Sequence, residues 1–412
     1  MNNPAFSIPV IDLSDRIDIQ TVVDREEGQY LGHVTTAMLE DGKTVFAVYP
    51  KSHAAGQVVL KRSDDGGYTW SERLPVPASW TWSLECPTLY RLTDASGKSR
   101  LYLFSGGYPG MRSVSEDDGK TFSEFESMGF GGIVFISTMV NLAPGKYAAF
   151  FHDEGYFIHG GNDAVWEVQA AGKGADRRAR LLIHESNDGG KTFASTRKWW
   201  VQPKECPGDE WETVYKCYAG KPFPDKRFKL YMIVTEDGGV TWTKPREIAD
   251  HEIGRLCEPL AIKSPDGSEM IVILRENARK LNSMLIKSTD SGETWSEAVE
   301  LPNALTGDRH TARYLPDGRL FITFRDMAKD STTKGSWVAW VGTYDDIVNG
   351  REGQYRILIK KNYDGWDCAY PGLELLPDGT LLTVTYGHWE EGKPPYILAV
   401  HIDVGKEERG LI

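Results

Sequence analysis

Short stretches rich in β-branched and aromatic residues recur along the whole chain, and polar turns separate them. Long apolar stripes with the 3.6-residue period of an amphipathic helix are hard to find. This pattern is typical of many short strands, so we predict an all-β protein. The clearest predicted strands are Val45–Tyr49, Leu101–Phe104, Leu230–Val234, Met270–Leu274, Leu320–Phe324 and Leu381–Tyr386.

An octapeptide of the form S/T-x-D-x-G-x-T-W/F occurs five times, mostly at intervals of about 50 residues. Its Asp side chain can accept hydrogen bonds from nearby backbone N–H groups, and its Gly can adopt positive φ, so each copy predicts a tight turn between two strands. A hairpin repeated at this interval indicates the blades of a β-propeller, with four strands each. The copies are Ser63–Trp70, Ser115–Phe122, Ser186–Phe193, Thr235–Trp242 and Ser288–Trp295.

A second repeat consists of a polar residue that is followed, eight positions later, by Asp-Gly. In a propeller the innermost strand of each blade starts near one mouth of the central channel, so equivalent positions on different blades converge there. We therefore predict that His33, Glu258, Arg309 and Tyr370 ring one pocket, with Glu85 as a looser fifth member. The alternative is that these residues are satisfied polar groups at strand ends.

The octapeptide resembles the Asp-box, or bacterial neuraminidase repeat, of the sialidase (neuraminidase) superfamily. The resemblance covers most of the chain and implies a six-bladed β-propeller. Inner strands that start near residues 33, 85, 136, 212, 258, 309 and 370 leave seven blades as the alternative. Asp-boxes lie in outer hairpins away from the active site and also occur in non-enzymatic propellers, so they imply a fold and not an activity. We expect the propeller at residues 29–404, insertions at 160–178 and 203–229, and a polar tail at 405–412.

The N-terminal segment, residues 1–28, is expected to supply a strand near Ile17–Val23 that pairs with Tyr396–Ile402. This pairing would close the ring and remove an open sheet edge.

Three residues match the family's register. The inner strand that opens with Glu258, the next strand that ends at Arg275, and the later strand that opens with Tyr370 resemble the corresponding sialidase strands. The resemblance implies that Tyr370 is the nucleophile, Glu258 its activating partner and Arg275 a clamp for the substrate carboxylate. We expect Arg309 and Arg325 to bind substrate in the same pocket.

A tyrosine nucleophile suits a sialic acid, which carries a carboxylate on its anomeric carbon. That carboxylate repels a carboxylate nucleophile but does not repel a neutral phenol, and tyrosine is a known exception to the two-carboxylate scheme of glycoside hydrolysis. Because the pKa of a free phenol is about 10, an adjacent base has to take the proton during attack.

The chain departs from the family at three places. The expected neighbourhood of the family's third arginine, Ser331–Trp337, offers only Lys334. Tyr30–Val34 lacks the family's first carboxylate-binding arginine, and Pro50–Gly56 lacks its general-acid Asp. The acid role would then pass to His53, His33 or Glu85, and histidine suits it because its unperturbed pKa is about 6.5.

Composition narrows the class of partner. Lys and Arg number 47 against 59 Asp and Glu, a formal net charge of −12, which argues against a nucleic-acid or anionic-membrane binder. No apolar run approaches the roughly 18–20 residues of a membrane helix, and no phosphate loop or metal-binding pattern is found. We therefore expect a glycan or glycoconjugate substrate, no membrane insertion, no cofactor and no metal. No secretory leader is predicted, which leaves the compartment open between the cytoplasm and, after removal of a leader, the periplasm or the exterior.

The sequence thus predicts an exo-acting glycoside hydrolase of the sialidase superfamily that removes a terminal sialic or other acidic sugar. Two alternatives stay open. One is a sialidase-like glycosidase or lyase that acts on a different sugar with a histidine acid or base, and the other is a non-catalytic glycan-binding propeller.

Overall fold

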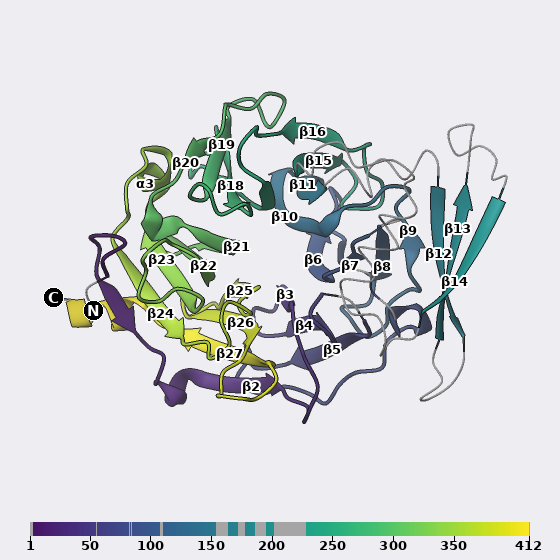
Figure 1. Cartoon of the computed structure of the whole chain (residues 1–412), viewed down its shortest axis with the longest axis horizontal. Coiled ribbons are helices and arrows are strands. Elements are labelled where there is room, and N and C mark those ends of the chain that lie inside the picture. Colours follow the sequence, from purple (N-terminus) through teal and green to yellow (C-terminus); the bar gives the residue numbers. More distant parts are fainter. Residues whose placement is uncertain are drawn as a thin grey trace.

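The computed structural model describes residues 3–153 and 228–411, apart from 55, 82, 84, 108 and 109, and between these parts the backbone of three strands. Six antiparallel sheets are arranged as blades around a central axis (Figure 1). The predicted all-β fold with six propeller blades is therefore confirmed. Among the residues described, no helix is both long enough and apolar enough to cross a membrane.

The first four blades follow one another along the chain, each beginning with its innermost strand. The first contains β3 (Thr35–Met38), β4 (Val45–Pro50) and β5 (Val58–Ser63). The second contains β6 (Thr88–Thr93), β7 (Ser99–Ser105), β8 (Met111–Ser115) and β9 (Glu126–Ser127). The third contains β10 (Ile133–Ala143), β11 (Lys146–Asp153), β15 (Lys229–Thr235) and β16 (Arg246–Ala249). The fourth contains β17 (Leu256–Lys263), β18 (Met270–Glu276), β19 (Met284–Ser288) and β20 (Val299–Glu300).

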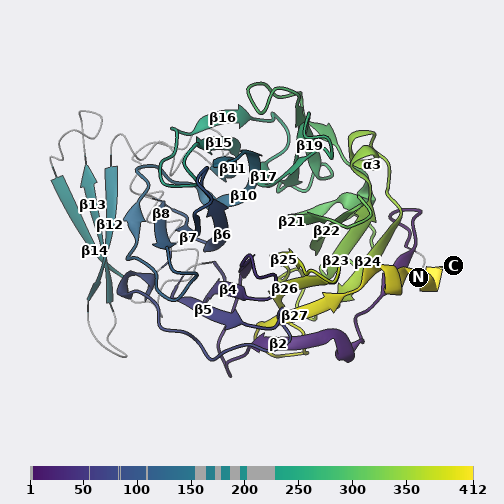
Figure 2. The same ribbon diagram turned by 180° about the vertical axis from the view of Figure 1, so that it is seen from behind.

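The last two blades each gain an outer strand from the N-terminal segment. The fifth contains β21 (Gly307–Tyr314), β22 (Leu320–Asp326), β23 (Trp337–Gly342), β24 (Tyr355–Lys360) and the parallel strand β1 (Val10–Asp12). The sixth contains β25 (Gly372–Leu375), β26 (Leu381–Gly387), β27 (Tyr396–Ile402) and β2 (Gln20–Asp24). The antiparallel pairing of β2 with β27 closes the ring as expected (Figure 2). The described helices are short: η1 (Ile17–Ile19), η2 (Ala78–Thr81), η4 (Asn303–Leu305), α3 (Tyr344–Val348), α4 (Val404–Glu407) and η5 (Glu408–Leu411).

A seventh sheet interrupts the third blade between β11 and β15. It contains β12 (Ala164–Ala171), β13 (Arg178–Glu185) and β14 (Ser195–Val201), and it stands outside the ring of blades in Figure 1. The expectation of two insertions, at 160–178 and 203–229, with a blade hairpin between them, is therefore wrong, because this hairpin pairs with β12 in a separate sheet. The octapeptide at 186–193 lies outside the described residues.

The second strand of each blade is buried along most of its length because neighbouring blades cover both faces. Every residue of β4 is buried, as is every residue of β27. Between the fourth and fifth blades, Ile271 and Ile322 belong to one buried cluster. Burying an aliphatic side chain of this size contributes about 1.5–3 kcal/mol, so contacts between blades stabilise the ring.

The outer turns formed by the described octapeptides share one hydrogen-bond pattern. In the third blade, Asp237 Oδ1 accepts hydrogen bonds from Thr241 N at 2.9 Å and from Thr235 Oγ1 at 2.8 Å. The backbone N–H of Gly239, at φ 94°, donates to Thr235 Oγ1 at 2.9 Å, and the Trp242 indole donates to the Gly239 carbonyl at 3.0 Å. The same Asp contacts recur at Asp65, Asp117 and Asp290. Each turn thus satisfies its own polar groups.

Candidate active site

Three of the residues in the second sequence repeat share an unusual backbone conformation. His33, Glu258 and Arg309 have φ values of 40°, 47° and 54°, and for Tyr370 the preceding residue, Ala369, has φ 57°. Left-handed backbone at a residue with a side chain costs about 1–3 kcal/mol and requires support from its surroundings. At Glu258 and Arg309 the pairing register also shifts, as in a β-bulge, which turns a side chain out of the regular alternation.

The structure brings Tyr370, Glu258 and Arg275 together. The Tyr370 hydroxyl donates a short hydrogen bond to Glu258 Oε1. Arg275 Nη1 donates to the same oxygen at 2.7 Å and to the Tyr370 oxygen at 3.1 Å. The three side chains come from β17, β18 and the loop before β25, so two blades supply this cluster. Its geometry is that of a phenol held against a carboxylate, which can take its proton.

The charges of this pair follow from burial and from the guanidinium. Burial, reinforced by the Glu258 carboxylate, raises the pKa of the Tyr370 phenol well above its usual value of 10. Burial also raises the pKa of Glu258, but the Arg275 guanidinium, together with the hydrogen bond from Tyr370, outweighs it and holds the pKa of Glu258 below its ordinary range. At neutral pH Glu258 is therefore an ionised acceptor, and Tyr370 keeps its proton until a reaction removes it.

A fully buried carboxylate, Asp308, organises the arginines behind this pair. Arg279 binds it with both Nη atoms at 2.7 Å, and Arg325 binds it with Nε at 3.0 Å and Nη2 at 2.6 Å. Arg275 Nε lies 3.1 Å from Asp308 Oδ1. Asp308 is absent from the sequence-based site because it belongs to no repeat, although it directly precedes Arg309. Arg309 and Arg325 were also expected to bind a substrate carboxylate. Arg325 instead donates hydrogen bonds to Asp308 of the protein.

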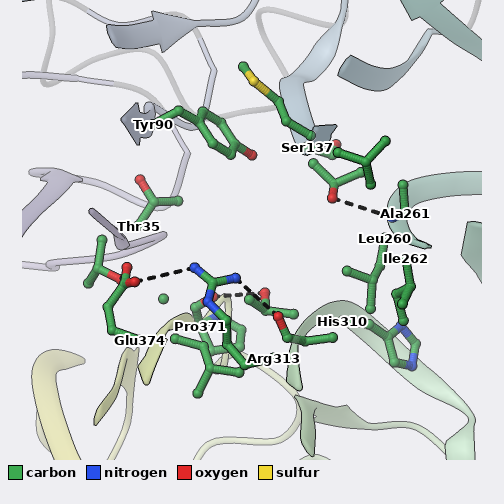
Figure 3. Close-up of a pocket in the computed structure, with 18 of the residues that line it drawn as sticks. Thr35, Tyr90, Ser137, Leu260, Ala261, Ile262, His310, Arg313, Pro371 and Glu374 are labelled. Atoms are coloured by element: carbon green, nitrogen blue, oxygen red, sulfur yellow. Dashed lines mark hydrogen bonds and ion pairs between the residues drawn. The ribbon is translucent and has the colours of Figure 1, made fainter. Parts of the chain in front are cut away.

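Arg309 contacts the inner strand of the third blade. Its guanidinium is buried and donates through Nη1 to the Ser137 carbonyl at 2.8 Å. Arg309 and Ser137 line a cavity of about 550 Å³ on the propeller axis. Residues of all six inner strands bound this cavity (Figure 3). The last expected member of the ring, Glu85, is half-buried beside Cys86, and its backbone carbonyl accepts a hydrogen bond from Ser83.

The axial cavity holds charged side chains among apolar ones. In Figure 3 Arg313 points toward Glu374, with 3.3 Å between Nη2 and Oε2, and Thr36 donates to the other Glu374 oxygen at 2.8 Å. Pro371, which follows Tyr370, lines the same cavity. The cavity therefore adjoins the Tyr370 cluster but is built from different side chains.

Two histidines, His33 and His53, follow one another beside the Tyr370 ring. The His33 ring meets the Tyr370 ring edge-on at 4.1 Å between centroids and meets the His53 ring at 4.5 Å. His33 is buried, and burial lowers its pKa well below 6.5, so it is neutral. The His53 side chain is 49% exposed, so it can meet a ligand in solution.

A carboxylate that the sequence reasoning missed, Asp367, connects this side of the site. Asp367 Oδ2 accepts a hydrogen bond from the Tyr30 hydroxyl at 2.7 Å, and Oδ1 accepts one from the Tyr386 hydroxyl at 3.0 Å. His53 Nδ1 lies 3.3 Å from Asp367 Oδ1. Burial acts to raise the pKa of Asp367, but contacts with His53, Tyr30 and Tyr386 outweigh it and hold the pKa well below its ordinary value. Asp367 is thus ionised.

Within the part of the chain that the structure describes, no group of three or more His, Cys, Asp or Glu side chains is placed to hold a metal ion.

Comparison with known proteins places the fold. No protein-family model matches the chain, and no curated protein matches it. Among solved structures, a Dyadobacter fermentans protein of unknown function superposes with a TM-score of 0.58 at 14% identity, covering 93% of this chain and 97% of that one. A Hadza microbial sialidase gives 0.52 at 13% identity, covering 92% and 66%. A leech intramolecular trans-sialidase gives 0.49 at 14% identity, covering 94% and 70%. At these identities the likeness shows the fold alone, and that fold is the sialidase-like β-propeller.

Proposed function

We propose that the protein is an exo-acting glycoside hydrolase of the sialidase superfamily that cleaves a terminal sugar through the pair Tyr370 and Glu258. The observation that carries the proposal is the hydrogen bond from the Tyr370 hydroxyl to the Glu258 carboxylate, with Arg275 in contact with both groups. A nucleophile, its base and an orienting cation in mutual contact form the arrangement expected for covalent catalysis.

The reaction proceeds in two displacements. In the first, the Tyr370 oxygen attacks the anomeric carbon while its proton passes to Glu258, and the bond to the leaving oxygen breaks. In the second, water attacks the same carbon and gives a proton to the group that protonated the leaving oxygen, the bond to Tyr370 breaks, and Tyr370 recovers its proton from Glu258. Two inversions retain the anomeric configuration.

The leaving oxygen needs a proton in the first step, and His53 is the candidate that the site favours. His33 is buried and neutral, so it carries no spare proton at neutral pH. His53 is half-exposed and lies beside the ionised Asp367. General acid assistance of this kind contributes about 10²–10⁴-fold to rate.

The first substrate to test is a sialoside, because a phenol nucleophile tolerates the carboxylate of sialic acid. The wild-type protein is expected to release 4-methylumbelliferone from its α-sialoside, and Tyr370→Phe is expected to lose that activity by about 10³-fold or more. Tyr363→Phe is a matched control, because Tyr363 is 56% exposed and lies outside the cluster. Glycan binding without turnover of any glycoside would overturn the proposal.

A second candidate, a glycosidase for sugars without an anomeric carboxylate, is favoured by Asp308. A guanidinium binds a carboxylate best through two parallel N–H groups. Arg279 spends both Nη atoms on Asp308, Arg325 spends Nε and Nη2, and Arg275 Nη1 is shared by Glu258 and Tyr370. The N–H groups of these three arginines therefore bind Asp308, Glu258 and Tyr370 of the protein. They are not arranged to bind the carboxylate of a sugar.

Competing 4-methylumbelliferyl glycosides separate the two candidates. Preference for the sialoside over neutral α- and β-glycosides supports the first candidate, and preference for a neutral glycoside supports the second. In both cases the Tyr370→Phe loss should be of the same order, because the nucleophile is common to both.

A further inference from the structure

His53, Tyr30 and Asp367 form a continuous chain of hydrogen bonds beside the Tyr370 ring. His53 Nδ1 lies 2.8 Å from the Tyr30 oxygen, and the Tyr30 hydroxyl lies 2.7 Å from Asp367 Oδ2. His53 comes from the loop between β4 and β5, and Asp367 from the loop between β24 and β25, so the chain bridges the first and sixth blades. The inner strands of these two blades, β3 and β25, also lie in contact.

The donors and acceptors of this chain determine where its protons lie. An ionised carboxylate only accepts, so the single hydroxyl proton of Tyr30 is donated to Asp367. The Tyr30 oxygen must then accept from His53, which requires a proton on Nδ1. Neutral His53 therefore carries its proton on Nδ1, and this hydrogen-bond chain makes no use of Nε2.

We propose that Tyr30 and Asp367 are positioning residues that hold His53 with Nδ1 protonated, so that Nε2 serves as the acid and then the base of glycoside cleavage. This inference rests on the proposed function. In the first step the Nε2 proton passes to the leaving oxygen as the glycosidic bond breaks. In the second step neutral Nε2 takes a proton from the attacking water, which returns His53 to its starting state.

The groups around His53 fit this role. Asp367 carries the negative charge that faces an imidazolium, and its other oxygen is held by the Tyr386 hydroxyl at 3.0 Å. His388 Nε2 lies 3.6 Å from Asp367 Oδ2 on the outer side, and neutral His33 packs against the His53 ring. Asp367 is thus fixed from several sides, whereas half of the His53 side chain stays open to solvent.

Leaving-group dependence is the kinetic test, because an aryl glycoside leaves without help and an alkyl or sugar leaving group needs a proton. With two substrates of the same sugar, His53→Gln is expected to lose about 10²-fold or more in kcat/KM on the disaccharide and less than about 10-fold on the 4-nitrophenyl glycoside. Asp367→Asn and Tyr30→Phe should show the same selectivity with smaller losses, about 10-fold on the disaccharide. Equal losses on both substrates, or no loss, would overturn the positioning role.

The matched control is Asp364→Asn. Asp364 lies three residues from Asp367 in the same loop, its carboxylate is 71% exposed, and it faces His388 at 3.5 Å. It should leave the ratio of the two kcat/KM values unchanged. Tyr30→Phe removes a single oxygen, so it keeps the test decisive even if Asp367→Asn folds poorly.

A spectroscopic measurement separates failure of this inference from failure of the proposed function. In ¹⁵N spectra of the full-length protein, neutral His53 is expected to carry its proton on Nδ1, and Tyr30→Phe should shift population toward the Nε2–H tautomer. An unchanged tautomer in Tyr30→Phe would overturn the positioning role whatever the activity. The expected tautomer together with no turnover of any glycoside would instead overturn the proposed function and leave the hydrogen-bond chain intact.

Discussion

The outer turns and the inner strand starts are both repeated in the blades, but they repeat different things. The outer turns repeat their side chains. Asp237 and its counterparts each accept a hydrogen bond from the backbone of a Thr four residues later and from the hydroxyl of a Ser or Thr two residues earlier. The inner starts repeat only their backbone: His33, Glu258 and Arg309 share a left-handed φ and carry an imidazole, a carboxylate and a guanidinium.

This difference separates stability from chemistry. A turn that satisfies its own polar groups is useful in any blade, so the same residues serve each time. A strained position at the channel mouth is useful only for the side chain that it directs, and different side chains meeting at one place can divide a reaction among them. Substitutions in the two regions should therefore have opposite signatures, which the following predictions test.

The largest expected effect is on rate, at an inner start. Glu258→Gln removes the base for Tyr370 and should lower kcat/KM by about 10²–10⁴-fold. The control is Glu374→Gln, which changes another buried glutamate on an inner strand, held by Thr36 and Arg313 in the axial cavity. Steady-state kinetics on the best aryl glycoside measures both. Retained activity in Glu258→Gln would contradict the assignment of the chemistry to the inner strand starts.

The next effect is on stability, behind the site. Asp308→Asn leaves the guanidiniums of Arg275, Arg279 and Arg325 without their shared counter-charge, and breaking a buried pair in this way costs about 3–5 kcal/mol. Urea denaturation gives the free energy of unfolding. A loss below about 1 kcal/mol would mean that the arginines find other partners, contrary to the organising role of Asp308.

An outer turn should show a smaller loss of stability and no loss of rate. Asp237→Ala removes the acceptor for Thr241 N and for Thr235 Oγ1, which should cost about 1–3 kcal/mol. Its kcat/KM should stay within about twofold of wild type, because the third blade's outer turn lies far from Tyr370 in the fold. A large drop in kcat/KM in a protein that remains folded would contradict the separation of the two regions.

The fold could be predicted from the sequence because each blade is recognised by features close together in the chain, which are its strands and turns. Apolar strands and self-contained turns recur in register and predict a propeller, but the number of six blades came from the family resemblance, because the strand starts themselves also allowed seven. The inserted sheet was misjudged because an octapeptide turn indicates a hairpin and does not say which sheet the hairpin joins. Pairing with β12 decides that, and it is a long-range property.

The candidate site could be predicted where it coincides with a repeat, with the family's register or, for His53, with the loop that carries the family's general acid. Tyr370, Glu258 and Arg275 occupy strand ends of known register, and the structure brings them together. Asp308 and Asp367 belong to no repeat, and their importance comes from partners on other strands and loops. Arg309 shares the backbone of Glu258, yet its longer side chain extends to the Ser137 carbonyl on the axis, which a register argument cannot reveal.

The smallest expected effect is the pH dependence of the stability that one outer turn contributes. Hydrogen bonds from Thr121 lower the pKa of Asp117 to about 2, from a usual value of 3.8. Because the folded-state pKa is the lower one, this carboxylate contributes stability above about pH 4 and loses it as the pH falls toward 2. The gap in unfolding free energy between wild type and Asp117→Asn should therefore narrow between pH 5 and pH 2. The other turn carboxylates titrate in both proteins, so their contributions cancel in the difference. A gap that stays constant over this range, measured by urea denaturation at each pH, would show that Thr121 binds the protonated carboxyl as well as the ionised one, and that the turns hold their shape without charge.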